Sequence, residues 1–184
     1  TRVDIISSTG SYPKGPNAVR TDCAAAGSCT YAEEIQNFAN WYTYYRSRIL
    51  SARAGVGRAF SLQSGNMRVG FGAINKGSTT VDNVSTETVV SGVRKFVGTD
   101  RTNFFTTLYG YTMPSSGTPL RHAMNDVGQY FSRTDDRGPW GETPGSTGGT
   151  QYSCRQNYHI LMTDGYWNTG SGQASTAAAR NNND

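Results

Sequence analysis

Two oxygen-bearing side chains stand where an α/β protein can bind a metal ion. Thr118 lies in a Gly-Thr-Pro turn that opens a helix, and Asp164 follows a short apolar run and precedes Gly165. Ligands bind beyond the carboxyl ends of the strands in open α/β sheets, and hydroxyl and carboxylate oxygens suit Mg²⁺, Mn²⁺ or Ca²⁺. The pair therefore indicates a divalent-cation site. A helix cap at Thr118 and an ordinary Asp-Gly turn are the simpler interpretation.

The three cysteines are used in different ways. Cys23 and Cys29 are six residues apart in a loop-like segment, which predicts a small disulfide loop and an oxidising compartment. A zinc site is less favoured, because no second Cys or His pair stands at ligand spacing. Cys154 is left over. It is a buried thiol, a reactive thiol or the partner of a cysteine outside this chain.

A hydrolase would need Cys154, His159 and Asp164 to act together as nucleophile, base and orienting group. Residues five apart along a strand point to opposite faces of the sheet. His159 therefore diverges from both Cys154 and Asp164, and we predict that the chain is not an enzyme.

A long amphipathic helix is predicted from Thr30 to about Phe60. It begins with a capping box formed by Thr30 and Glu33. Apolar residues follow at alternating steps of three and four: Ile35, Phe38, Tyr42, Tyr45, Ile49, Ala52, Val56 and Ala59. This heptad spacing is also typical of a coiled coil, but aromatic residues fill the seam, which favours packing on a sheet.

The rest of the chain predicts an α/β layer. Residues 67–74 and 87–93 are expected strands around a polar loop, and a short helix follows Asp100. A second helix begins with Thr118 as N-cap and Pro119 as its first residue, and ends near Ser132. Residues 134–152 are a long loop, and Tyr158–Thr163 is a buried strand. This order favours a largely parallel, open sheet with flanking helices.

Composition excludes several function classes. The 184 residues carry a net charge of +4 without a block of like charges, which does not predict nucleic-acid binding. The basic group at Arg46, Arg48, Arg53 and Arg58 is better explained as a solvated helix face. No stretch approaches the roughly 20 apolar residues of a membrane span. The 22 glycines and 11 tyrosines, with only 16% charged residues, are common in extracellular proteins.

Several long motifs resemble PilY-type proteins, the tip-associated adhesins of type IV pili. They are the run from Tyr31 to Arg46, Met67 to Gly72, Gly117 to Arg121 with Val127 to Tyr130, Gly138 to Gly141, and Cys154 to Tyr158 leading into Ile160 to Trp167. Together they extend from about residue 20 to 168.

The resemblance implies a von Willebrand factor A-like fold of Rossmann-like type, with a metal-ion-dependent adhesion site. Thr118 matches the second element of that site and Asp164 the third. The first, an Asp-x-Ser-x-Ser segment after a central strand, does not occur in this sequence. The fold is therefore expected to be incomplete here, lacking its first strand and later strands.

The resemblance also implies an organisation, a location and partners. We expect an extended lead-in over 1–30, a von Willebrand A-like core over 31–168 and a flexible tail over 169–184. The protein would be exported through the periplasm and outer membrane to the pilus tip. Its partners would be minor pilins, the rest of the same protein and a host-cell or abiotic surface. A purely structural pilus-tip fragment without metal is the alternative.

Overall fold

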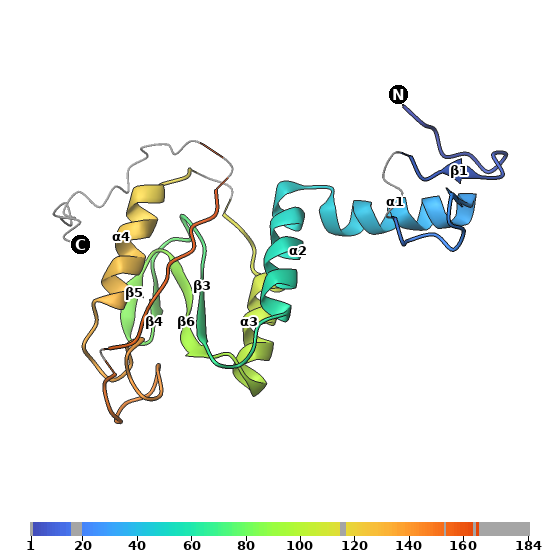
Figure 1. Ribbon diagram of the computed structural model, residues 1–184. Helices are drawn as coiled ribbons and strands as arrows, with labels where there is room; N and C mark the ends of the chain where they lie inside the picture. The colour runs from blue at the N-terminus through green and yellow to red at the C-terminus, as the bar shows by residue number, and fades with distance from the viewer. Residues whose placement is uncertain (1, 16–19, 115–116, 153, 164, 166–184) are drawn as a thin grey trace. The chain divides into compact units, whose positions relative to one another are not determined.

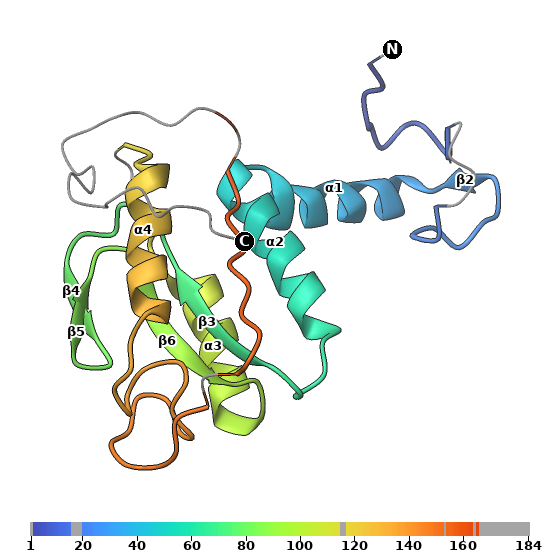
Figure 2. The ribbon, with the colours of Figure 1, turned by 60° about the vertical axis from the view of Figure 1, so that its left-hand side comes forward.

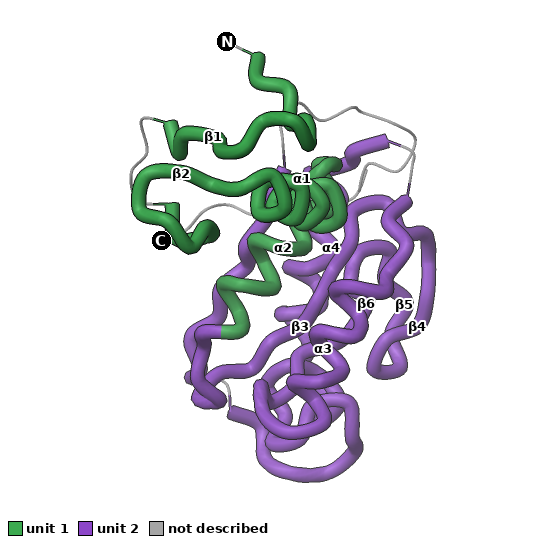
Figure 3. The backbone as a smooth tube through the Cα atoms, turned by 90° about the vertical axis from the view of Figure 1, so that its right-hand side faces the viewer, with its two compact units in different colours: residues 1–61 green, residues 62–184 purple. Residues whose placement is uncertain are grey.

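The computed structural model describes residues 2–15, 20–114, 117–152, 154–163 and 165. The chain divides into two compact units, residues 1–61 and 62–184 (Figure 3). The expected core over 31–168 spans both units and stays a prediction. The expected tail over 169–184 lies outside the described residues.

Unit 1 begins with a loop that strand pairing, a disulfide and a buried lysine hold in place. Strands β1 (Tyr12–Pro13) and β2 (Ser28–Cys29) pair antiparallel, and the predicted disulfide between Cys23 and Cys29 is present. The buried Lys14 ammonium group donates to the carbonyls of Arg20 (3.0 Å) and Cys23 (3.2 Å). Residues 2–6, in the expected extended lead-in, form neither a strand nor a helix.

The predicted capping box begins helix α1 (Tyr31–Tyr45). The Thr30 hydroxyl accepts from the Glu33 amide at 3.3 Å, and the Glu33 carboxylate accepts from the Thr30 amide at 2.7 Å. The prediction of one helix to Phe60 is wrong, because the chain bends and a second helix, α2 (Arg48–Ser61), follows (Figure 1).

Serine side chains explain the break between the two helices. The Ser47 hydroxyl accepts from the Leu50 amide at 3.3 Å, as an N-cap does, and the Ser51 hydroxyl donates to the Tyr45 carbonyl at 3.0 Å. Such side chains offer the backbone partners other than those of a continuous helix. The expected packing of the apolar stripe on a sheet is not found in α1, which contains no buried residue.

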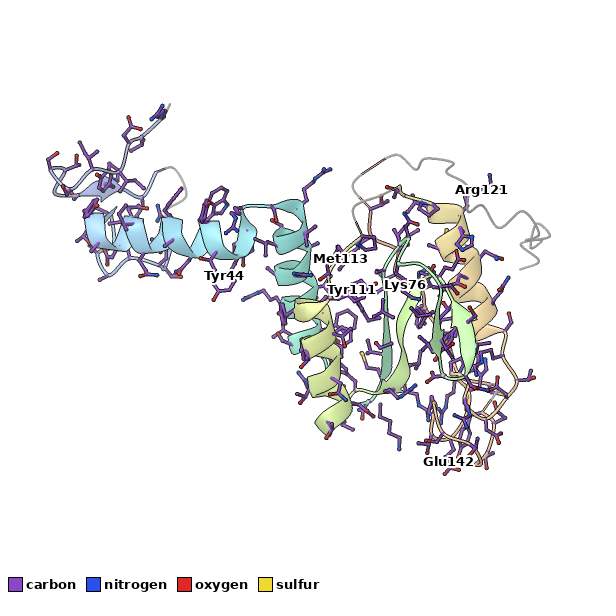
Figure 4. The ribbon with its side chains drawn as sticks, turned by 180° about the vertical axis from the view of Figure 1, so that it is seen from behind. Tyr44, Lys76, Tyr111, Met113, Arg121 and Glu142 are labelled. Atoms are coloured by element: carbon purple, nitrogen blue, oxygen red, sulfur yellow. A yellow bond between two sulfur atoms is a disulfide. The ribbon has the colours of Figure 1, made fainter. Side chains whose placement is uncertain are left out.

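Unit 2 is a mixed α/β structure built on two long strands. Strands β3 (Arg68–Gly72) and β6 (Val89–Lys95) pair antiparallel, close to the two predicted strands. Helices α3 (Gly98–Gly110) and α4 (Leu120–Phe131) lie on opposite sides of this pair (Figures 1 and 4). Every strand pair among the described residues is antiparallel, so the prediction of a largely parallel sheet is wrong there.

The two helices form separate small cores with the strand pair. On α3, Phe104 and Leu108 are buried, and the Phe104 ring meets the Phe96 ring edge-on at 5.4 Å. On α4, Val127 and Tyr130 pack against Val89 of β6. Asp100 lies in the first turn of α3 and does not cap it, since the N-cap is Val97.

A β-hairpin replaces the polar loop that was predicted over residues 75–87. Strands β4 (Thr79–Val81) and β5 (Val84–Thr86) pair around Asp82 and Asn83, whose φ angles are 53° and 69°. Asp and Asn tolerate this left-handed conformation better than most residues, and two such residues define a tight hairpin turn.

The predicted loop over residues 134–152 is held by one arginine. Arg68 of β3 donates to the carbonyls of Pro139 (3.2 Å), Gly141 (2.7 Å) and Glu142 (2.8 Å), the last of which is labelled in Figure 4. The Trp140 indole donates to the Phe131 carbonyl at 2.7 Å. The loop is therefore anchored to both β3 and α4.

The prediction of a strand over Tyr158–Thr163 is wrong in the described structure. Residues 155–163 follow an extended path, which lies next to β3 in the view of Figure 2, but form no β-ladder. Every residue from 154 to 163 is exposed except the half-buried Leu161, and the large apolar side chains of Tyr158 (78%), Ile160 (74%) and Met162 (56%) are among the exposed ones. The run is therefore an extended, exposed segment, and the prediction that it is buried is wrong as well.

Candidate functional site

Thr118 lies in the loop that leads into α4, and its side chain is half-buried. Its carbonyl accepts from the Leu120 amide at 2.9 Å. The N-cap of α4 is Pro119, without a side-chain capping hydrogen bond, so the prediction that Thr118 caps this helix is wrong. The simpler interpretation of Thr118, as a helix cap, therefore does not hold.

The second predicted ligand, Asp164, lies outside the described residues. Its neighbours Thr163 and Gly165 are described, and the amide of Gly165 lies 3.4 Å from the Thr163 hydroxyl. The extended run ends at the same end of unit 2 as the start of α4 (Figures 1 and 2). The two elements that carry the predicted ligands thus reach the same end of the unit.

The loop between β3 and β4 contacts the chain just before α4. The Asn75 amide group donates to the Gly117 carbonyl at 3.4 Å. Lys76, labelled in Figure 4, donates to the Thr86 carbonyl and the Thr79 hydroxyl, both at 2.6 Å. These contacts join the β3–β4 loop to the chain before α4 and to β5.

A histidine–glutamate pair adds a further contact here. His122 Nε2, in the first turn of α4, lies 2.9 Å from Glu87 Oε2, without a well-aligned hydrogen bond. Burial lowers the pKa of the Lys76 ammonium group, and the carboxylates of Asp126 and Glu87 partly oppose this effect. The Lys76 ammonium group and the carboxylates of Asp126 and Glu87 therefore lie near one another beside the β3–β4 loop.

Asp126 is the polar residue of this region that the sequence did not single out. One oxygen of its carboxylate accepts from the Thr86 hydroxyl and from the amides of Thr88 (2.7 Å) and Glu87 (3.1 Å). The carboxylate thus fastens α4 to the turn between β5 and β6. The signal that could have found it is the Thr-Glu-Thr triplet between two strands, whose amides need an acceptor.

The described residues do not by themselves form a cation site. Across the described part of the chain, the ligand-type side chains close enough to share an ion are Cys23, Cys29 and Glu34, and the two cysteines are joined in a disulfide. The described carboxylates near the start of α4 are those of Glu87 and Asp126, and both have protein partners. Metal binding by Thr118 and Asp164 stays a prediction.

The residues of the hydrolase alternative lie on the extended run. The side chains of Cys154 and His159 are exposed, and neither forms a hydrogen bond with another described residue. Partial burial lowers the pKa of His159. Among the described residues, Cys154 and His159 therefore do not form the nucleophile–base pair that a hydrolase would need.

Comparison with known proteins yields three similar sequences of one kind. The chain is 35% identical over 164 residues to the type IV pilus biogenesis factor PilY1 of Pseudomonas aeruginosa strain PAK, which is 89% of this chain and 14% of that protein. It is 38% identical over 154 residues to PilY1 of strain PAO1 and 32% identical over 160 residues to PilY1 of strain UCBPP-PA14. These matches cover 81% and 87% of the chain, and 13% of each relative.

The three relatives are all named as type IV pilus biogenesis factors, and the chain is similar to one region of each. It is a region of PilY1 type, as the sequence motifs predicted, and it spans only about one seventh of the relatives' length. The relatives are named as pilus biogenesis factors and not as enzymes, in agreement with the prediction that the chain is not an enzyme. No family model matches the chain, and no solved structure matches it.

The helices that the structure describes include none with the length and apolar character to cross a membrane.

Proposed function

We propose that this chain acts in type IV pilus biogenesis and surface attachment, as a module of a PilY1-type protein at the pilus tip. The observation that carries the proposal is its similarity to three PilY1 proteins over 81% to 89% of its length. Its partners would be minor pilins, the rest of the same protein and a host-cell or abiotic surface, which requires export to the cell surface. The disulfide supports a location outside the reducing cytoplasm.

We further propose that unit 2 is part of a von Willebrand factor A-like fold. Three observations support this fold: the helices on opposite sides of the β3–β6 pair, the extended apolar run that lies next to β3 in the view of Figure 2, and the unpaired backbone of that run. A strand from the part of the protein outside these 184 residues would complete the sheet between β3 and the run.

In such a fold Thr118 and Asp164 would contribute oxygen ligands to a divalent cation. The approach of both chain segments to one end of unit 2 supports this role (Figures 1 and 2). Mg²⁺, Mn²⁺ and Ca²⁺ prefer oxygen ligands. An ion with an open coordination position would bind a carboxylate of the partner.

The test uses the complete protein in its own bacterium, with Thr118→Ala and Asp164→Ala tested separately. Thr112→Ala is a matched control, because Thr112 is an exposed threonine in the same connection between α3 and α4. We expect both site variants to reduce divalent-cation-dependent attachment about tenfold or more, and the control to attach normally. Counts of surface pili separate attachment from assembly.

The alternative is a purely structural module without metal. It predicts that both site variants attach as well as the control, with or without a chelator. Loss of surface pili in both site variants would instead show that these residues serve assembly.

A further inference from the structure

One side of α1 is an exposed apolar surface. It is formed by Ile35, Phe38, Trp41, Tyr42 and Tyr45, here called the aromatic face. These five side chains are between 38% and 52% exposed. Contiguous exposed apolar surface of this kind marks interaction sites, and spacings of three and four residues place the side chains on one side of the helix.

The aromatic face is already ordered before a partner binds. The Phe38 ring lies 5.8 Å from the Trp41 ring and 6.1 Å from the Tyr42 ring. The capping box fixes the start of α1, and the Asn37 side chain contacts the sulfur of Cys23 in the disulfide loop. Binding by this face would therefore cost little conformational entropy.

The charged residues at the two ends of the aromatic face restrict the kind of partner that can bind it. No charged residue occurs from Ile35 to Tyr45, so burial of this face desolvates no ion. Glu34 borders the face at its start, where it pairs with Arg20 at 3.0 Å, and Arg46 borders it at its end, with its guanidinium group over the Tyr42 ring at 4.5 Å. A partner should be apolar in the middle, acidic opposite Arg46 and basic opposite Glu34.

A second copy of α1 in antiparallel orientation meets all three requirements. Phe38 then lies opposite Tyr42 of the other copy, and Ile35 opposite Tyr45, because these positions are spaced symmetrically about Asn40. The same symmetry brings the acidic border of one helix to the basic border of the other, and the helix dipoles also run in opposite directions. We propose that two copies of this chain associate through their aromatic faces in an antiparallel, two-fold pair.

Sedimentation of the complete chain tests the association. We expect a concentration-dependent dimer, twice the 19.9 kDa of one chain. Phe38→Gln should raise the dissociation constant about tenfold or more. Thr43→Gln is the matched control, since Thr43 is exposed on α1 but is not three or four residues from any member of the aromatic face, and it should change the constant less than about twofold. A monomer at all concentrations up to roughly 100 μM, or equal effects of both variants, would overturn the proposal.

Cross-linking tests the orientation independently of affinity. With Cys154 replaced by Ser, a chain carrying Phe38→Cys is mixed with one carrying Tyr42→Cys under mild oxidation. The antiparallel pair predicts disulfides in the mixture and few in either variant alone. Efficient cross-linking within each single variant would show parallel pairing and overturn the proposed arrangement, and absence of any cross-link would overturn the contact itself.

Discussion

At the scale of single residues, the centre of unit 2 is a hydrogen-bonded network around Tyr130. Its hydroxyl accepts from the Val93 amide at 2.8 Å and lies 3.2 Å from the Asp82 carboxylate, which also pairs with the Arg94 guanidinium. Arg133 donates to the Asp82 carbonyl at 2.7 Å. One phenol thus connects α4, β6 and the hairpin turn.

Burial raises the pKa of Tyr130 to about 12. A raised pKa means that the neutral phenol is favoured in the folded state, so its contribution to stability is complete below the unfolded pKa of about 10 and is lost as pH rises through 12. At pH 11 the loss should reach about 1.4 kcal/mol.

The measurement compares urea unfolding of the wild type and of Tyr130→Phe at pH 8 and pH 11. At pH 8 the variant should be less stable by about 1–2 kcal/mol, because the Val93 amide loses its acceptor. That difference should shrink at pH 11. A difference independent of pH would contradict a raised pKa.

At the scale of elements, the sequence predicted well where local signals acted alone. The capping box, the length of α4 and the positions of β3 and β6 follow from side-chain type and spacing. The break at Ser47 was missed because the apolar spacing continues across it, while the serine hydroxyls take over backbone partners. The hairpin around Asp82 and Asn83 was missed because its strands are short and polar, although the Asp-Asn pair was the available signal.

The same limits apply to the candidate site. Spacing identified Thr118, but whether it caps α4 depends on the backbone path through Pro119, which is set by tertiary contacts. Asp126 was missed because the Thr-Glu-Thr triplet indicates that its amides need an acceptor but not which carboxylate, about forty residues away in sequence, supplies it. Long-range partners of this kind follow from the fold and not from the pattern.

The N-terminal cap of α1 leads to a prediction for this element. Thr30→Ala removes one hydrogen bond of the capping box and should destabilise the first turns of α1 by about 1 kcal/mol. Hydrogen exchange of the amides of residues 33–37 should accelerate about fivefold. Thr43→Ala is the control, because Thr43 is exposed within α1 and alanine favours the helix there. Equal exchange in Thr30→Ala and the wild type would show that Glu33 alone holds the cap.

At the scale of the whole molecule, the extended run over residues 155–163 is a segment of unit 2 whose backbone has no backbone partner among the described residues. Among the described residues the backbone of residues 154–163 forms no hydrogen bonds to other backbone groups, and the apolar side chains of Tyr158, Ile160 and Met162 are exposed. A strand without neighbours costs free energy, because its amides and carbonyls must be satisfied by water while its apolar side chains stay exposed. A neighbouring strand that completed the sheet would pair these backbone groups and bury these apolar side chains.

The unpaired run predicts a difference in hydrogen exchange between the 184-residue chain and a longer protein that includes its upstream neighbours. In the shorter chain the amides of residues 155–163 should exchange almost freely, whereas in the longer protein they should slow about 100-fold or more, as strand amides do when a neighbour pairs with them. Strand β6 is the internal control, because β3 pairs with it in both proteins. Unchanged fast exchange in the longer protein would mean that the run is a loop and that Asp164 is not held at the end of a strand. Slowed exchange would place Asp164 at the carboxyl end of a paired strand, the position from which it could share an ion with Thr118.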